Sequence, residues 1–306
     1  METRILGDDL KVSAIGLGCM GFSHAYGAPM DEEEAIKTIQ AAYNAGERFF
    51  DTAEIYQGVN PDGSTNYNEE LVGKALHDVR DNVVIATKFG IHNIEGKSST
   101  QEIAVDSSPE AIRKSVEGSL KRLNTDHIDL YYQHRIDPKV EPEVVADVMK
   151  ELIEEGKIKA WGVSNFDVND LEELWRLKNG TNCVANEDLY NLDSRGIEFN
   201  LLPLMKQHQL PLIAYSPLAQ GDNLSGKLTD NSLLKEIAAN HHATVSQIML
   251  AWVLRIGNVL AIPKSSSPKH AEENVTAGNI ELSDDELLAL QKEFPSPTKK
   301  EPLAVI

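Results

Sequence analysis

"HIDLYYQHRIDPKVEPEVVADVMKELIEEGKIKAWGVSNF", residues 127–166, is the stretch that decides the fold of this chain. It opens with an apolar, strand-like run at 127–134, continues with a helical pattern at 142–157 and closes with a second strand-like run at 158–165. Neighbouring strands run parallel when a helix of this length connects them. The segment therefore predicts a βαβ unit in a parallel sheet covered by helices.

The same alternation of strands and helices continues on both sides of this segment. Six further strand-like runs lie at 11–18, 48–53, 82–90, 183–188, 211–218 and 258–265. Helical patterns lie between them, at 30–46, 68–79, 109–124, 168–178, 198–209, 233–242 and 245–257. Eight such βα units in roughly 260 residues match a closed barrel. We therefore predict an α/β fold, a (β/α)8 TIM barrel.

Several segments lie outside this repeat. Residues 3–13 predict an N-terminal β-hairpin that turns at 7–9 and plugs the bottom of the barrel. Two helical pieces follow the last strand, at 267–278 and 283–294, so we expect additional C-terminal helix before an irregular tail. No linker rich in Pro, Gly or Ser divides the chain, and we predict a single domain over residues 1–306.

Composition narrows the classes of function. The net charge of −19 disfavours nucleic-acid binding, which needs clustered Lys and Arg. No apolar stretch reaches the roughly 20 residues of a membrane span, and the first ten residues lack the apolar region of a secretory signal. The two cysteines, Cys19 and Cys183, have no disulfide or metal-binding pattern, so we predict a cytoplasmic protein without a metal site. The oligomeric state is not indicated.

"AIGLGCMGFS" at 14–23 contains the spacing G-x-G-x-x-G at Gly16, Gly18 and Gly21, which is typical of a dinucleotide-binding turn. That turn needs a helix directly after the glycines, because the helix N-terminus binds the pyrophosphate. Here Gly27 and Pro29 interrupt the place where the helix should run. We therefore expect the match to be coincidental.

Four acid–base side chains follow the predicted second, third and fourth barrel strands. Asp51, Lys88 and His134 end these strands, and Tyr56 lies five residues after Asp51. Barrel enzymes react at this end of their strands. An ammonium stabilises a phenolate and lowers the phenol pKa from about 10, a carboxylate holds the ammonium, and an imidazole orients a substrate oxygen. Each residue alone also fits a structural role, but together they predict an active site.

These residues lie in motifs that resemble the aldo-keto reductase family along essentially the whole chain. The clearest are "GERFFDTAEIYQ", "VVIATKFG", "IDLYYQHRID", "GKIKAWGVSNF", "LIAYSPLAQG" and "IPKSSSPKHAEEN". The resemblance implies reduction of aldehydes or ketones by NADPH on a (β/α)8 barrel, without a metal. It implies that Tyr56 is the general acid, that Lys88, held by Asp51, lowers the pKa of Tyr56, and that His134 directs the carbonyl.

The resemblance also implies a set of cofactor contacts. It places Ser164, Asn165 and Glu187 at the nicotinamide carboxamide, Tyr215 against the ring, Gly18, Cys19 and Met20 near the nicotinamide ribose, Ser216 and Leu218 at the pyrophosphate, Lys264, Ser265, Ser267 and His270 around the 2′-phosphate, and Asn274 at the adenine. It also counts Asp51 among the cofactor-binding residues.

Two of these positions depart from the family pattern. Glu187 stands where the family usually has Gln, and its charge is expected to favour NADP⁺ over NADPH relative to that Gln. Asn186 is the alternative contact if the register is offset. His270 stands where many members have Arg, and a mostly neutral ring predicts tolerance of NAD(H) beside NADP(H).

Substrate specificity is expected to come from the loops at 23–30, 57–67, 90–107 and 219–231, whose composition names no particular carbonyl compound. Two other functions stay open. In the first, Lys88 forms a Schiff base in a lyase. In the second, the chain is a cofactor-binding regulatory subunit that resembles the potassium-channel β subunits.

Overall fold

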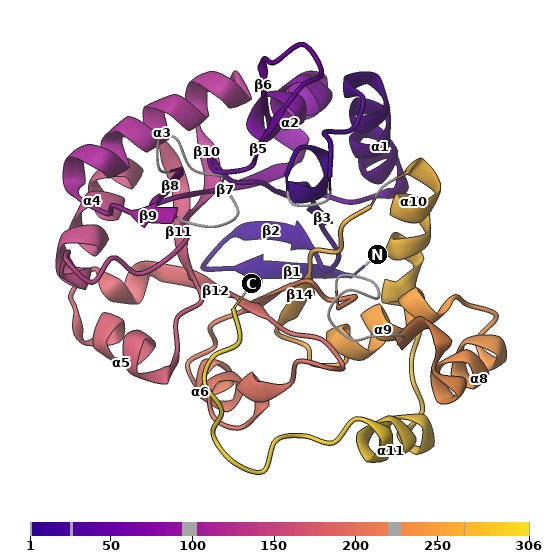
Figure 1. Ribbon diagram of the computed structural model, residues 1–306. Coiled ribbons are helices and arrows are strands. Elements are labelled where there is room, and N and C mark those ends of the chain that lie inside the picture. Colours follow the sequence, from indigo (N-terminus) through magenta and orange to yellow (C-terminus); the bar gives the residue numbers. More distant parts are fainter. Residues whose placement is uncertain (1, 25–26, 94–102, 220–227, 266, 306) are drawn as a thin grey trace.

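The computed structural model describes residues 2–24, 27–93, 103–219, 228–265 and 267–305, and these form a closed parallel barrel (Figure 1). In chain order its strands are β3 (Leu17–Gly18), β4 (Phe49–Asp51), β7 (Val84–Phe89), β10 (Ile128–Gln133), β11 (Ile158–Ser164), β12 (Cys183–Leu189), β13 (Leu212–Tyr215) and β14 (Val259–Ala261). Parallel bridges from Ile15 to Ala261 and from Gly18 to Lys264 join the first strand region to the last. The predicted (β/α)8 barrel is confirmed.

Helices surround the barrel on its outer side. They are α1 (Glu32–Ala45), α2 (Asn68–Leu76), α3 (Pro109–Leu123), α4 (Pro142–Glu154), α5 (Val168–Arg176), α6 (Leu201–Gln207), α8 (Ser232–Asn240), α9 (Val245–Leu254), α10 (Pro268–Thr276) and α11 (Asp284–Glu293). Short 3₁₀ turns are η1 (Met20–Phe22), η2 (His77–Asn82), η3 (Gly180–Asn182), η4 (Gly196–Glu198), η5 (Leu228–Asp230) and η6 (Ala277–Asn279). Many of the helices begin at the caps that the sequence offers; Asp31, for example, accepts hydrogen bonds from two backbone N–H groups of α1. The expected helices α10 and α11 after the last strand are confirmed.

Alternation along the strands divides the apolar residues into two cores. In β7, Val84 and Ala86 belong to the core inside the barrel, whereas Ile85 and Phe89 pack between the sheet and the helices. Lys88 follows Val84 and Ala86 on the inner face, because side chains two residues apart in a strand share a face. The strand therefore points an ammonium into the mouth of the barrel.

The N-terminal hairpin is β1 (Thr3–Leu6) paired with β2 (Leu10–Ser13). Its Leu6 and Val12 join the inner core, so it closes the bottom of the barrel as predicted. The predicted single strand over 11–18 is wrong: it is divided into β2 and β3, because residues 10–13 are needed for the hairpin.

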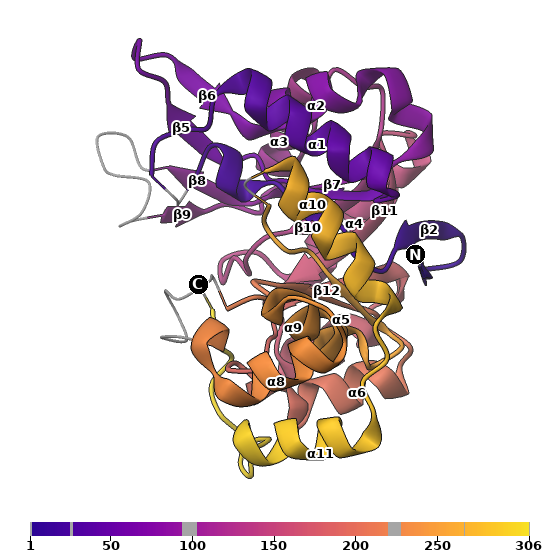
Figure 2. The same ribbon diagram turned by 90° about the vertical axis from the view of Figure 1, so that its right-hand side faces the viewer.

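Two small hairpins lie at the other end of the barrel. They are β5 (Gln57–Val59) with β6 (Thr65–Tyr67), and β8 (Ile91–Asn93) with β9 (Ile103–Val105). Figure 2 shows them on the opposite side of the molecule from β2. They follow β4 and β7, so they mark the end at which the active-site side chains emerge.

The glycine motif has a packing role. A Cβ atom at Gly16 would lie 2.6 Å from the carbonyl oxygen of Phe49, and one at Gly18 would lie 2.6 Å from that of Ile262. One at Gly21 would lie 2.5 Å from Cε of Lys264. Gly21 itself lies in the short turn η1, and the first α-helix among the described residues, α1, begins at Glu32. The glycines thus allow close contact where the barrel closes, and the coincidence expected for the Rossmann pattern is confirmed.

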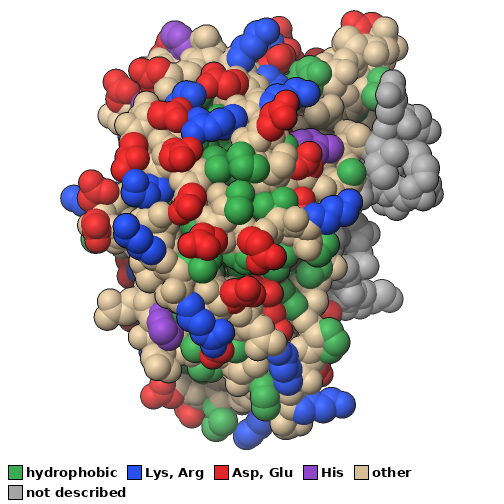
Figure 3. Space-filling model, turned by 90° about the vertical axis from the view of Figure 1, so that its left-hand side faces the viewer, with side chains coloured by type: hydrophobic (Ala, Val, Ile, Leu, Met, Phe, Trp, Pro, Cys, Tyr) green, Lys and Arg blue, Asp and Glu red, His purple; other side chains and the backbone are tan. Residues whose placement is uncertain are grey.

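Acidic and basic side chains are mixed over one outer face of the molecule (Figure 3). Ion pairs between partly exposed side chains include those of Arg113 with Glu151 and Glu155, and of Lys157 with Glu117. Within the described ranges, no helix combines the length and the apolarity that a membrane span requires.

Candidate active site

The four predicted acid–base residues meet in the mouth of the barrel. Lys88 on β7 donates a short hydrogen bond to Oδ1 of Asp51, at the end of β4. The Lys88 ammonium lies 5.3 Å from the centre of the Tyr56 ring. The ring of His134, directly after β10, meets that of Tyr56 edge-on, with 6.0 Å between centroids. Consecutive strands of the barrel thus bring together four types of polar group.

The Lys88 side chain is completely buried and surrounded by oxygen atoms. Besides Asp51, its Nζ donates to the Thr52 carbonyl oxygen at 3.0 Å and lies 3.4 Å from Oε1 of Glu187. Burial by itself lowers the pKa of Lys88, but the charges of Asp51 and Glu187 outweigh this effect, and the pKa lies above its usual value. Lys88 is therefore held as an ammonium ion.

Several groups act on the pKa of Tyr56 in opposite directions. Burial raises the pKa of the Tyr56 phenol above its usual value. Lys88 acts in the expected direction and lowers this pKa, but Asp51 and Glu187 raise it further, so the net shift is upward. The lowering that was expected from Lys88 is therefore present, but burial outweighs it in the protein by itself. Tyr56 is thus a protonated hydrogen-bond donor at neutral pH.

The two histidines beside Tyr56 differ in their surroundings. Burial, with the charge of Lys88 adding to it, brings the pKa of His134 well below its usual value, so this imidazole is neutral. Its Nδ1 is buried and has no hydrogen-bond partner among the described residues. His24 stacks on the Tyr56 ring at 5.8 Å, and its Nδ1 lies 3.0 Å from the Gln57 carbonyl oxygen. Sequence reasoning did not find His24, since it lies in no recognisable motif.

A second group that sequence reasoning missed fixes the backbone around Tyr56. Asn68, the first residue of α2, donates to the hydroxyl of Ser23 at 2.7 Å and to the Cys19 carbonyl oxygen at 2.9 Å. Ser23 donates in turn to the Tyr56 carbonyl oxygen at 3.2 Å. Asn68 also accepts from Thr52 at 2.7 Å. The sequence shows Asn68 only as an ordinary helix start.

The residues expected at the nicotinamide carboxamide lie beside this cluster. Ser164 donates to the Glu187 carbonyl oxygen at 3.0 Å, and Asn165 donates to the Ser164 hydroxyl at 2.7 Å. The Tyr215 hydroxyl donates to Oδ1 of Asn165 at 2.8 Å. Asn165 and Ser216 both have positive φ, a conformation that non-glycine residues keep only where surrounding contacts fix it. The ends of β11, β12 and β13 thus form one polar wall.

The Glu187 carboxyl points into the barrel. It lies beside Lys88, whereas the adjacent Asn186 faces outward and bonds the backbone of Phe166 through both ends of its amide. The strand register thus makes Glu187, rather than the alternative Asn186, the residue of this pair at the mouth. Its pairing with Lys88 was not foreseen, because the two residues are far apart in the sequence.

The residues expected around the 2′-phosphate and adenine gather at the start of α10. Ser267 caps this helix and accepts from the backbone N–H of His270 at 3.3 Å. Asn274 donates to the hydroxyl of Ser265 at 3.0 Å. A helix N-terminus carries partial positive charge, which suits a phosphate group. Lys264 leads into this region from β14, and its side chain passes over Gly21.

Other expected positions are placed as follows. Gly18, Cys19 and Met20 lie where β3 passes into η1, and Cys19 donates its backbone N–H to the Asp51 carbonyl oxygen at 2.8 Å. Leu218 is partly buried after β13. The loop stretches 25–26, 94–102 and 220–227, expected to contribute to specificity, lie outside the described residues. No group of three or more potential metal ligands occurs within the described ranges.

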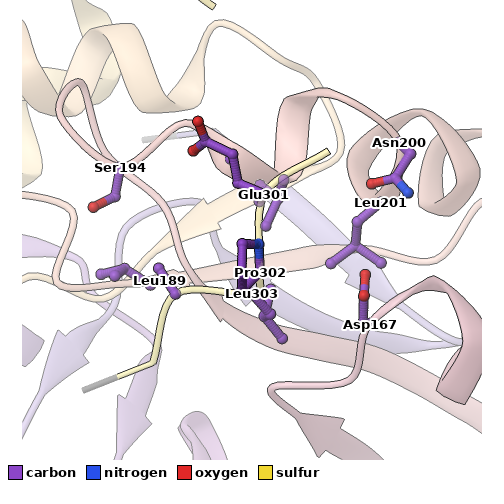
Figure 4. Close-up of a pocket in the computed structure, with 11 residues that line it drawn as sticks. Asp167, Leu189, Ser194, Asn200, Leu201, Glu301, Pro302 and Leu303 are labelled. Carbon is purple, nitrogen blue, oxygen red and sulfur yellow. The ribbon is translucent and has the colours of Figure 1, made fainter. Parts of the chain in front are cut away.

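A small pocket lies elsewhere, under the C-terminal tail (Figure 4). Leu189, Ser194 and Leu201 line it from one side, and Pro302 and Leu303 of the tail cover it. It contains none of the four acid–base residues. It is a gap beneath the tail and is separate from the reaction centre.

Comparison with known proteins agrees with this arrangement. The model of the aldo/keto reductase family matches residues 14–292. Methylglyoxal reductase YeaE from Escherichia coli strain K12 is 37% identical over 298 residues, which cover 97% of this chain and 96% of that protein.

Solved structures show the same relationship. A crystal structure of an aldo-keto reductase from Klebsiella pneumoniae in complex with NADPH matches with a TM-score of 0.85 and 37% identity, covering 100% of this chain and 99% of that one. A second structure from Klebsiella pneumoniae, in complex with NADP and acetate, gives the same TM-score of 0.85 and 37% identity, covering 99% of each chain.

These matches span nearly the whole chain and agree with the barrel, the polar mouth and the motifs that suggested the family. They confirm the expected oxidoreductase class. A structural homologue binds NADPH, which is the cofactor that the sequence predicted. The chain thus belongs to the aldo/keto reductase family of oxidoreductases.

Proposed function

We propose that this reductase converts small aldehydes and ketones to alcohols with NADPH, and that Tyr56 is its general acid. The convergence of Tyr56, Lys88, Asp51 and His134 in one mouth carries this proposal. The phenol is the acid of this set that remains protonated yet lies beside a fixed ammonium. Such a pair donates a proton and stabilises the phenolate that remains.

The roles follow from the contacts. When bound, NADPH supplies the hydride that reduces the carbonyl carbon. Tyr56 gives its hydroxyl proton to the carbonyl oxygen, and Lys88 stabilises the resulting phenolate. Asp51 fixes Lys88 in place through its short hydrogen bond. The neutral His134 orients the carbonyl oxygen as a hydrogen-bond partner.

The polar wall and the start of α10 fit the two ends of the cofactor. Ser164, Asn165 and Tyr215 offer amide and hydroxyl groups for a carboxamide and a ring face for stacking. Lys264 and the capped N-terminus of α10 offer positive charge for a phosphate. Because His270 is exposed and replaces a fixed charge, we propose that NAD(H) is tolerated beside NADP(H).

The polar mouth and one relative guide the choice of substrate. Because the relative from Escherichia coli is named a methylglyoxal reductase, we propose a small dicarbonyl as the first substrate to assay. A panel of aldehydes, ketones and sugars, followed by NADPH absorbance, tests this choice. We also propose a cytoplasmic setting, which suits the two buried, free cysteines.

The alternative of a Schiff-base lyase needs Lys88 as a neutral amine. The raised pKa of Lys88 and its three oxygen neighbours keep it charged, which argues against that chemistry. The alternative of a regulatory subunit is tested by turnover itself, since a subunit that acts only through a partner reduces no carbonyl compound.

Replacing Tyr56 by Phe tests the assignment of the general acid. Tyr56→Phe should lower kcat for carbonyl reduction by roughly 10²- to 10⁴-fold, because only the proton donor is removed. NADPH binding, measured by quenching of protein fluorescence, should stay near that of the wild type. Tyr131→Phe is the matched control, since this buried hydroxyl lies in the outer core and has no described hydrogen-bond partner. Wild-type turnover in Tyr56→Phe would contradict the proposal.

A further inference from the structure

The Lys88 ammonium is shared by two buried carboxyl groups. Asp51 makes the shorter contact, and Oε1 of Glu187 lies 3.4 Å from Nζ. The two carboxyl groups also act on each other's pKa. Each also has one buried oxygen, Oδ2 of Asp51 and Oε2 of Glu187, that has no hydrogen-bond partner among the described residues. The proposed mechanism uses Asp51 but leaves Glu187 without a task.

Charge balance decides how this group is protonated. Two carboxylates and one ammonium would leave a net negative charge inside the barrel, which is costly in a medium of low polarity. When like charges share a site, one of them keeps a proton. Asp51 binds Lys88 more closely, so the proton belongs on Glu187, where it can form a hydrogen bond with Asp51.

We propose that Glu187 is a positioning residue that holds this proton, shares Lys88 with Asp51 and thereby sets the pH range in which Tyr56 works as a proton donor. The inference rests on the proposed role of Tyr56. When Glu187 loses its proton, its negative charge partly cancels the effect of the Lys88 ammonium on Tyr56. The pKa of the Tyr56 phenol then rises. Tyr56 then gives up its proton less readily, and carbonyl reduction slows.

The surroundings of Glu187 limit which groups act on it. Asp51 reaches it from β4, Lys88 from β7, Tyr132 from β10 and Tyr56 from the loop after β4. On the β11 and β13 sides it pairs with the uncharged Ser164 and Ile213. Burial, together with the charge of Asp51, raises the pKa of Glu187 to about 8, although Lys88 opposes this. The proton is therefore present at neutral pH and lost in mildly alkaline solution.

The proton on Glu187 also determines the pH at which the charge of this residue can act on the cofactor. The preference for NADP⁺ over NADPH expected from that charge needs an ionised carboxylate. It should therefore emerge only as the pH rises past the Glu187 pKa of about 8.

The first test compares pH profiles of reduction in the wild type and Glu187→Gln. The amide keeps the shape of the side chain but cannot ionise. Between about pH 7 and about pH 9 the wild-type kcat should fall by up to about tenfold, the loss of the protonated fraction of one group, while the variant stays level. The comparison concerns the shape of each pH profile and not its absolute height, because Glu187 contacts Lys88 and its replacement can change kcat at every pH. A wild-type profile without this step, or the same step in Glu187→Gln, would overturn the inference.

Asp188→Asn is the matched control. Asp188 is the adjacent buried carboxyl, its pKa is also raised by burial, and it makes no described contact with Lys88. This variant should keep the wild-type step. Loss of the step in Asp188→Asn would show that Asp188, and not Glu187, is the titrating residue, and it would overturn the inference.

The second test needs no turnover. Infrared spectra of the free protein at about pH 7 should show a protonated carboxyl band to which Glu187 contributes together with other buried acids such as Glu47 and Asp188. Glu187→Gln should lower this band by the share of one carboxyl group, and the remaining band should change less between about pH 7 and about pH 9 than the wild-type band does. Equal band intensity in the wild type and Glu187→Gln would overturn the inference. Turnover in Tyr56→Phe would instead refute the proposed general acid, so the two failures are distinguishable.

Discussion

At the residue scale, the chemistry of this protein depends on charges buried beside one another. Lys88 is fully buried, and Asp51 and Glu187 are nearly so. Burying an isolated charge costs free energy. Here the Lys88 ammonium lies beside carboxyl groups, and one proton shared by those carboxyl groups keeps the net charge of the cluster close to zero. The phenol of Tyr56 is therefore tuned by the occupancy of one proton and by the position of one ammonium.

His270 gives a prediction at the same scale. His270→Arg should raise the preference for NADPH over NADH by roughly tenfold, because a guanidinium is permanently charged and presents several N–H donors to a phosphate. The measurement is the ratio of kcat/KM for the two cofactors. His77→Arg, an exposed histidine after α2, is the control for added charge. An unchanged ratio in His270→Arg would remove this residue from the phosphate site.

At the element scale, strand alternation sorts neighbouring residues between two environments. On β7, Lys88 faces the mouth, whereas Thr87 faces outward and donates to Glu69 of α2 at 2.7 Å. On β12, Glu187 faces Lys88, whereas Asn186 bonds the backbone of Phe166. A shift of register by one residue would exchange these roles and dismantle the site.

The closure of the barrel gives a prediction for an element. Gly16→Ala should destabilise the protein by about 1–3 kcal/mol, because the added methyl meets a backbone oxygen that cannot move without disturbing the sheet. Gly257→Ala is the control, since a Cβ there meets nothing within 4 Å. Thermal unfolding of both variants measures the difference. Equal Tm values for Gly16→Ala and the wild type would mean that the junction is loosely packed.

At the scale of the whole molecule, Glu47 and Asp188 stand out as fully buried acids. None of their carboxyl oxygens has a hydrogen-bond partner among the described residues, and burial raises both pKa values well above the usual range. The unfolded chain releases these protons at lower pH than the folded protein does. The contribution of these two groups to the free energy of unfolding is therefore fully present below the unfolded carboxyl pKa of about 4, and it falls as the pH rises above that value.

Replacing one of these acids tests that dependence. Asp188→Asn should raise Tm by a few degrees at neutral pH, because it removes the cost of keeping a proton on a buried carboxyl. The gain should shrink as the pH approaches about 4, where Asp188 is protonated in both states. Asp81→Asn, at an exposed position, controls for the change in net charge. A gain that is constant over this range would show that Asp188 does not titrate between the two states.

Much of this architecture could be predicted without coordinates. Strands and helices follow from local periodicity, and eight repeats of one unit leave few ways to close a sheet. The four acid–base residues Asp51, Tyr56, Lys88 and His134 were predictable because barrel topology brings successive strand ends to one rim. The sequence assigned residues 11–13 both to the hairpin and to the first barrel strand, and only the structure ends β2 at Ser13 and begins β3 at Leu17.

The sequence by itself determined the barrel, the family resemblance and the identity of the candidate acid–base groups, because these depend on residue type and spacing. Only the tertiary structure decided the net direction of the Tyr56 pKa, the pairing of Glu187 with Lys88 and the hydrogen bonds from Asn68 through Ser23 to the Tyr56 backbone. The physical reason is that burial and distance set electrostatic energies. Both arise from contacts between residues far apart in the chain.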